Sequence, residues 1–177
     1  IENSLPAIVH KHPEVLFVIV GENPVHSLAH KENMRRIIEN EVVKLALEKN
    51  VLMLGQVARD ELIQLFFASD VFVLPGIEVK GDMEGFGIVL IEASAAGKPV
   101  VASRIGGISD AVENEKSGFL VPVGNWDKFS STIMDIIGSS TKAHSIGEYG
   151  RSRARNQFDW SIIGKRYMNV LAAIKTS

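Results

Sequence analysis

The chain has 177 residues, of which 46% are hydrophobic and 23% are charged, with a formal net charge of -2. This length and composition are typical of one globular domain with its own core, and they exclude a disordered or fibrous chain. The charge excludes the strongly basic surface of a nucleic-acid-binding protein. The absence of cysteine excludes disulfides, thiolate chemistry and cysteine-based metal sites, and it fits a reducing compartment.

Helical and strand patterns alternate along the chain. Residues 1–8 read as the middle of a helix, so we expect the sequence to be a fragment that lacks its upstream residues. Five apolar runs predict strands, at 15–20, 51–54, 71–74, 99–102 and 119–121. Apolar residues at spacings of three and four predict helices at 32–50, 59–69, 88–96, 127–137 and 160–174, with a polar and basic surface helix within 138–156. Either Asn125 or Asp127 could cap the helix at 127–137.

The strand runs are continuously apolar rather than alternating, which is typical of parallel strands covered on both faces. Strands that alternate with helices predict an α/β fold, a Rossmann-like doubly wound parallel sheet. With no linker-like stretch, residues 1–177 form a single domain. Ligands of such sheets bind beyond the carboxyl ends of the strands, and the runs end near Gly21, Gly55, Pro75 and Ala102.

One segment at such an end carries the chemistry. Glu84-Gly85-Phe86-Gly87 follows an open loop and leads into the apolar helix at 88–96. Glycines allow close approach of the backbone, and the first turn of the helix points unpaired N–H groups at the loop. This arrangement is suited to a diphosphate.

Two glutamates flank this glycine-rich turn. A helical wheel places Glu92 among Ile88, Ala95 and Ala96, where a carboxylate is costly to bury unless a ligand such as a ribose diol hydrogen-bonds it; the alternative is that Glu92 reaches solvent. Glu84 could instead simply favour the helix dipole. Their Cα atoms should be ~10–12 Å apart if the steps between them are helical, too far for a retaining glycosidase pair at about 5–5.5 Å. The two carboxylates suit the two ends of one elongated ligand.

These residues resemble a known family. The segment from Glu84 to Ala93 is similar to the E-x7-E motif of family-4 retaining glycosyltransferases of the GT-B fold, the glycosyl transferases group 1. Further similar segments cover nearly all of the chain in order, at 54–57, 69–75, 96–103, 106–112, 117–121 and 158–160. The resemblance identifies the chain as the C-terminal, donor-binding domain of such an enzyme, without the N-terminal acceptor domain and the first strand.

The resemblance implies the following roles. Glu92 binds the ribose of a UDP- or GDP-sugar, and Glu84 lies beside the transferred sugar as the catalytic-site carboxylate. The backbone of Gly85, Phe86, Gly87, Ile88 and Val89 holds the sugar and diphosphate, and the main chain of Val57 meets the base. The sugar is transferred with retention to a lipid, saccharide or other acceptor, and neither a metal nor a further cofactor is needed.

The sequence departs from the family at one point. The Arg and Lys that neutralise the diphosphate in the family are absent from this chain, and Lys80, Lys98 and Arg104 are the nearby candidates to replace them. We therefore expect the isolated chain to bind nucleotide weakly and to be inactive in transfer.

Other patterns leave alternatives open. His26 and His30 have a helical metal-site spacing but lack a convincing third ligand. A basic stretch near the end of the chain comprises Lys142, Arg151, Arg153 and Arg155. It is either a solvated helix face or a surface that contacts an anionic membrane. In the second case the protein is cytoplasmic and peripheral on the inner face of the membrane. A dinucleotide-dependent oxidoreductase is excluded because Leu90 stands where the third glycine of its motif belongs. A GT-B sugar-nucleotide epimerase and a non-catalytic nucleotide-binding module remain the alternatives.

Overall fold

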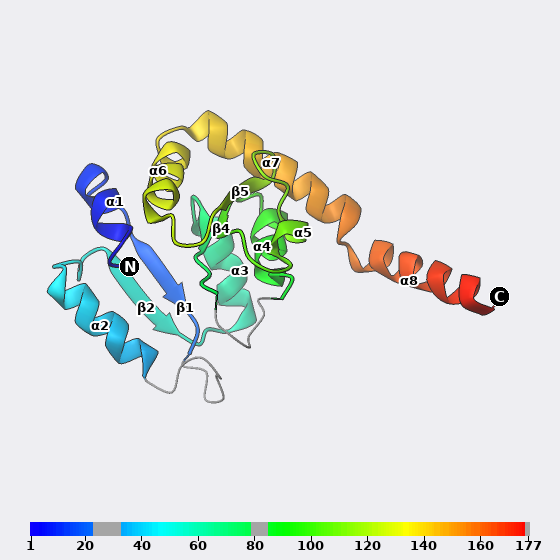
Figure 1. Ribbon diagram of the computed structural model, residues 1–177, viewed down its shortest axis with the longest axis horizontal. Coiled ribbons are helices and arrows are strands. Elements are labelled where there is room, and N and C mark those ends of the chain that lie inside the picture. Colours follow the sequence, from blue (N-terminus) through cyan, green and yellow to red (C-terminus); the bar gives the residue numbers. More distant parts are fainter. Residues whose placement is uncertain (23–32, 79–84, 176–177) are drawn as a thin grey trace.

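All five expected strands are present, and they form two parallel groups (Figure 1). The computed structural model describes residues 1–22, 33–78 and 85–175. Strand β1 (Phe17–Val20) pairs with β2 (Val51–Gly55), and β4 (Val100–Ser103) lies between β3 (Phe72–Leu74) and β5 (Gly118–Val121). Every pair is parallel, which confirms the α/β fold. In the described part of the chain no ladder joins β1 to β3, so the expected single sheet is divided into two.

The helices match the predicted order, with corrections at their ends. Their bounds are α1 Leu5–Lys11, α2 Met34–Lys44, α3 Arg59–Ala68, α4 Ile88–Ala95, α5 Ile108–Ala111, α6 Trp126–Ile137, α7 Ser140–Gln157 and α8 Trp160–Lys175. The expectation that residues 1–8 lie inside a helix is wrong, because α1 begins at Leu5 with a proline in its first turn, a position that proline favours. The prediction of helix as far as residue 50 is also wrong, because Ala46 adopts a left-handed φ of 54°. The short helix α5 was not predicted.

Side chains fix several helix starts, those of α6 and α7 among them. Asn125, rather than Asp127, caps α6, since its side chain accepts a hydrogen bond of 3.0 Å from the amide of Lys128. Ser139 caps α7 in the same way through the amide of Lys142. Helix α7 was expected to be a surface helix, yet one of its faces is buried, at Ile146, Gly147, Gly150 and Ala154.

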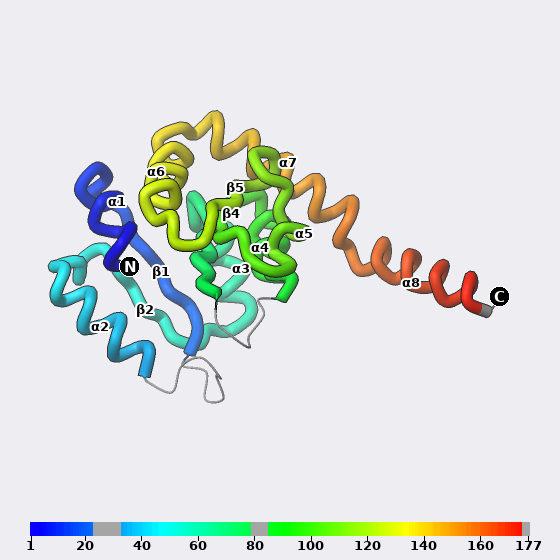
Figure 2. Tube along the Cα trace, viewed as in Figure 1, coloured from blue at the N-terminus to red at the C-terminus, as the bar shows by residue number. Residues whose placement is uncertain are grey.

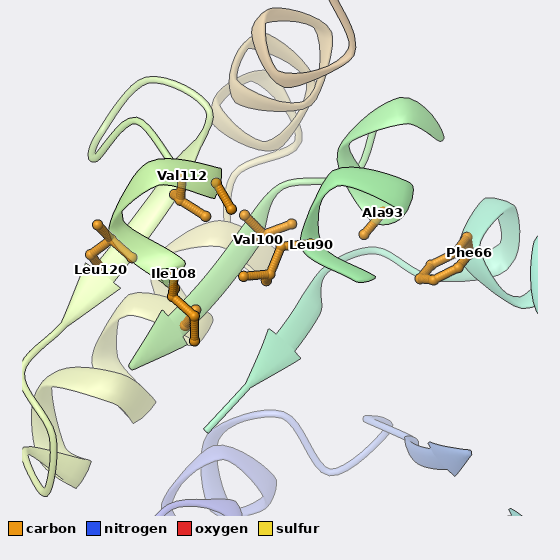
Figure 3. Close-up of a cluster of buried hydrophobic side chains, with 9 residues drawn as sticks. Phe66, Leu90, Ala93, Val100, Ile108, Val112 and Leu120 are labelled. Atoms are coloured by element: carbon orange, nitrogen blue, oxygen red, sulfur yellow. The ribbon is translucent and has the colours of Figure 1, made fainter. Parts of the chain in front are cut away.

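The core lies on both sides of the three-stranded sheet. Side chains of β4 alternate between the faces, with Val100 and Ala102 in a cluster with helices α3, α4 and α5 (Figure 3) and Val101 in a cluster with α1 and α6. Helix α1, far from α6 in the sequence, lies beside it (Figure 2). Because Leu5 packs with β1 and α2 while Ile8 packs against α6, α1 joins the two strand groups.

Coverage on both faces, which the apolar runs predicted, holds for β4 but not for β2. All four residues of β4 are buried. In β2 burial alternates along the strand, and Leu52 and Leu54 are 43% and 38% exposed. One face of β2 therefore lacks cover from the described residues.

Candidate functional site

The glycine-rich turn lies at the start of α4. Gly87 is the residue before the helix and adopts a left-handed conformation with φ 71° and ψ 51°. A Cβ disfavours this conformation by roughly 1–2 kcal/mol, which explains a glycine here. The carbonyl of Gly87 accepts a hydrogen bond of 2.9 Å from the amide of Leu90, so the left-handed residue leads directly into the first helical turn.

Four amides at this helix start have no partner among the described residues. They belong to Phe86, Gly87, Ile88 and Val89. Helix α4 adds its dipole at the same end, equivalent to about half a positive charge. Unpaired amides and a helix N-terminus together favour an anion, so the geometry expected for a diphosphate is present.

The turn is held against the start of α5. A Cβ built on Gly107 would be only 2.9 Å from the carbonyl oxygen of Gly85, and one built on Gly87 would be 3.4 Å from Cγ1 of Ile108. The ends of β3 and β4 are tied nearby, since the amide of Gly76 donates to Oγ of Ser103 over 2.9 Å. The backbone of 85–87 is therefore positioned by the loop that follows β4.

Glu92 lies on the exposed face of α4. It is exposed, as is Ile88 one turn earlier at 66%, whereas Leu90, Ala93 and Ser94 are buried. No hydrogen bond or ion pair engages its carboxylate in the described part of the chain. Of the two alternatives for Glu92, the structure therefore shows the one in which its carboxylate reaches solvent, because Ile88 and Ala95 beside it on the helix are exposed as well. The carboxylate is thus free to meet a ligand.

The other predicted residues are distributed unevenly around this point. Glu84 and Lys80 lie outside the described residues. Val57 is partly buried between the end of β2 and α3, and so belongs to the other strand group.

The two remaining cation candidates, Lys98 and Arg104, lie at opposite ends of β4. Lys98 follows α4 and precedes β4, which places it at the end of the helix opposite Gly87. Arg104 directly follows β4 and is exposed at the carboxyl edge. Of these two, only Arg104 lies at the edge where the glycine-rich turn begins.

Few features of the described residues support a metal site or contact with a membrane. His26 and His30 lie outside the described residues, and residues 1–22, 33–78 and 85–175 hold no group of three or more His, Cys, Asp or Glu side chains suited to a metal. In the described ranges no helix has the length and apolar character needed to cross a bilayer. Three cations of the basic stretch have partners within the chain: Lys142 lies over the ring of Phe119, Arg151 is 3.7 Å from Glu148, and Arg153 binds carbonyls of α5.

Two contributors to the site were missed by the sequence reasoning. Arg153 was assigned to a basic surface and Phe158 only to a matching motif, yet Phe158 contacts the ring of Phe86 beside Gly87. No local pattern identifies such a contact, because the two rings come from elements far apart in the chain.

The fold and this helix end define a Rossmann-like α/β domain with a glycine-rich turn and a helix N-terminus at the carboxyl edge of its sheet. Residues 3–153 match the model of the family described as glycosyl transferases group 1. The chain belongs to this family.

The chain is similar to several known proteins along most of its length. A GDP-mannose-dependent monoacylated alpha-(1-6)-phosphatidylinositol monomannoside mannosyltransferase of Corynebacterium glutamicum is 28% identical over 95% of this chain and 42% of its own length. Sucrose-phosphate synthase of Thermosynechococcus elongatus has a TM-score of 0.77 at 30% identity, over 97% of this chain and 42% of that one. The Anabaena protein Alr3699/HepE, solved in complex with UDP, has a TM-score of 0.80 at 26% identity, over 96% and 44%.

The chain thus spans about 42% of the length of the relatives that it matches. Its structural neighbours are GT-B glycosyltransferases.

Proposed function

We propose that residues 1–177 form the C-terminal nucleotide-sugar-binding domain of a retaining glycosyltransferase. The observation that carries this proposal is the helix end at Gly87, where four amides without a partner among the described residues and the dipole of α4 converge. A transferase needs to hold and stabilise a leaving diphosphate, and positioned backbone donors do so without reorganisation.

The donor is a UDP- or GDP-sugar. A relative named for GDP-mannose and a neighbour solved with UDP support a nucleotide sugar, without separating the two bases. We assign the ribose to Glu92, the transferred sugar to Glu84, and the base to the main chain of Val57. The amides of Phe86 to Val89 take the sugar and diphosphate. The donor requires no further cofactor or metal in this proposal.

Catalysis in this scheme is positioning. The acceptor attacks the sugar on the face that the diphosphate leaves, so the configuration at the anomeric carbon is retained. Glu84 orients the sugar hydroxyls and is not a nucleophile. The amides at Gly87 stabilise the charge that grows on the leaving phosphate.

The full enzyme also has an N-terminal acceptor domain and one more strand. The missing ladder between β1 and β3 among the described residues supports an additional strand before α1. Connected to β1 by a right-handed crossover, that strand would lie beside β1 on the side away from β2. The same upstream part would supply the Arg and Lys that neutralise the diphosphate, with Arg104 contributing from this domain. The isolated chain then binds nucleotide weakly and does not transfer sugar. We place the enzyme in the cytoplasm.

Calorimetric titration of the 177-residue chain with UDP and with GDP tests this proposal. We expect binding of one nucleotide, weakened at least about tenfold in Glu92→Gln, a loss of roughly 1.4 kcal/mol. Glu48→Gln is the matched control, because Glu48 is an exposed glutamate in the turn before β2, at the opposite end of that strand from Val57. Absence of binding to either nucleotide would overturn the proposal, and equal affinity in wild type and Glu92→Gln would overturn the role of Glu92.

A further inference from the structure

The Phe86 side chain, beside the turn that we assign to the diphosphate, is held by an aromatic contact with Phe158. The ring centroids of Phe86 and Phe158 are 5.5 Å apart, and the rings are inclined at 55°, a tilted geometry that aromatic pairs favour. Phe86 directly precedes Gly87, and Phe158 is the residue that ends α7. The contact therefore connects the start of α4 to the joint between α7 and α8.

Phe158 is itself held by a cation. Arg153 stands five residues before Phe158, within α7. Its guanidinium carbon lies 4.8 Å from the centroid of the Phe158 ring, within the range of a cation–π interaction. The Arg153 side chain is only 14% exposed, so solvent competes little for it. A largely enclosed guanidinium against the ring restricts the positions that Phe158 can take.

Arg153 is anchored in turn to α5. Its Nη1 donates to the carbonyl of Ala111 over 2.5 Å, and its Nη2 donates to the carbonyl of Asp110 over 2.8 Å. These carbonyls belong to the last residues of α5, where a cation satisfies unpaired acceptors and complements the helix dipole. The fork of the guanidinium reaches both acceptors at once.

These contacts connect both ends of α5 to the segment 85–87. Helix α5 begins directly after Gly107, and Gly107 lies against the carbonyl of Gly85. The segment 85–87 is thus contacted at Gly85 by the start of α5 and at the Phe86 ring by Phe158, and Arg153 connects Phe158 to the end of α5. Figure 1 shows α7 passing over α4 and α5 on its way to α8.

We propose that Phe158 and Arg153 are positioning residues for the diphosphate-binding turn. Phe158 fixes the Phe86 ring, and Arg153 fixes Phe158, so that the amides of Phe86 to Val89 already face the ligand in the free protein. An ordered turn binds an anion more tightly because less conformational entropy is lost on binding. This inference rests on the proposed function, since it concerns the nucleotide diphosphate assigned to the same turn.

Two measurements on the 177-residue chain test the inference: calorimetric titration with UDP and GDP, and hydrogen exchange of the amides at 85–89 without nucleotide. In Phe158→Leu we expect the dissociation constant to rise between about twofold and tenfold, as the loss of one aromatic pair implies, and these amides to exchange faster. Phe158→Tyr keeps the ring and should restore both values to near those of wild type. Arg153→Gln should shift them in the direction of Phe158→Leu.

Trp160→Ala is the matched control, because Trp160 is an aromatic residue two positions further on that is 84% exposed; it should leave both values unchanged. The inference is overturned if Phe158→Leu is folded yet binds and exchanges like wild type, or if Trp160→Ala has the same effect as Phe158→Leu. A wild-type chain that binds neither nucleotide overturns the proposed function itself. Equal binding by wild type and Phe158→Leu leaves the proposed function standing and removes only the role of Phe158.

Discussion

The carbonyl oxygen of Gly85 occupies the space that a side chain on Gly107 would need, since a Cβ there would be 2.9 Å away from it. Two loops far apart in the sequence are thereby packed backbone against backbone at the start of α4. The absence of a side chain at Gly107, rather than an unusual φ, makes this approach possible.

Replacing Gly107 with alanine should therefore move the turn that we assign to the diphosphate. We expect Gly107→Ala to lose ~1–3 kcal/mol of stability, as overpacking does, and to bind nucleotide more weakly than wild type. Denaturant unfolding and calorimetric titration measure the two effects. Full retention of both stability and affinity would show that the two loops separate easily.

Gly147 tests the packing of α7 on the end of α4. A Cβ at this position would be 2.0 Å from the carbonyl oxygen of Gly97, so Gly147→Ala should destabilise the chain by about 3 kcal/mol or prevent folding. Gly164→Ala in α8 is the matched control, because nothing lies within 4 Å of its Cβ position. It should leave stability unchanged or raise it by up to ~1 kcal/mol. Thermal unfolding of both variants distinguishes close packing from helix propensity.

Asn125 tests the cap of α6. The Asn125 side chain accepts a hydrogen bond from the amide of Lys128, whereas Asp127 lies within the first turn of the helix. Asn125→Ala should cost ~1 kcal/mol, and Asp127→Ala only a few tenths through the helix dipole. Denaturant unfolding of the two variants measures the difference. A larger loss in Asp127→Ala would reverse the assignment.

Glu113 should give the chain a weak dependence of stability on acid. A hydrogen bond from Lys116 and another from Tyr149 hold the pKa of Glu113 below its ordinary value. A lowered folded-state pKa means stability that is fully present above the unfolded value, about 4.3, and lost as the pH falls through the folded value. The difference in melting temperature between wild type and Glu113→Gln should thus be present at pH 7 and shrink below about pH 4. A difference that stays constant down to pH 3 would contradict this origin.

Much of the fold could be predicted because it depends on neighbours in sequence. The apolar runs at 71–74 and 99–102 predicted β3 and β4, and the periodicity at 59–69 predicted α3 to within one residue. Helix ends were less certain. After α2 the chain leaves the helical conformation at Ala46, which has a left-handed φ. The sequence does not indicate this end, because alanine ordinarily favours a helix.

The candidate site was predicted only in part. The left-handed turn at Gly87 and the helix after it follow from residue types, since glycine tolerates a conformation that other residues avoid. Between the two alternatives for Glu92, a carboxylate buried against a ligand or one exposed to solvent, the sequence could not decide. A helical wheel gives the neighbours of a residue on its helix, but which face meets the core depends on the other elements that cover that helix.

The sequence by itself determined the alternation of strands and helices, the glycine-rich turn before α4 and the family. The tertiary structure decided the division of the strands into two groups, the solvent-facing carboxylate of Glu92 and the contact of Phe86 with Phe158. The physical reason is the range of the interactions. Backbone propensity and apolar periodicity act over a few residues, whereas packing between α4, α5 and α7 joins segments that only the crossovers of the parallel sheet bring together.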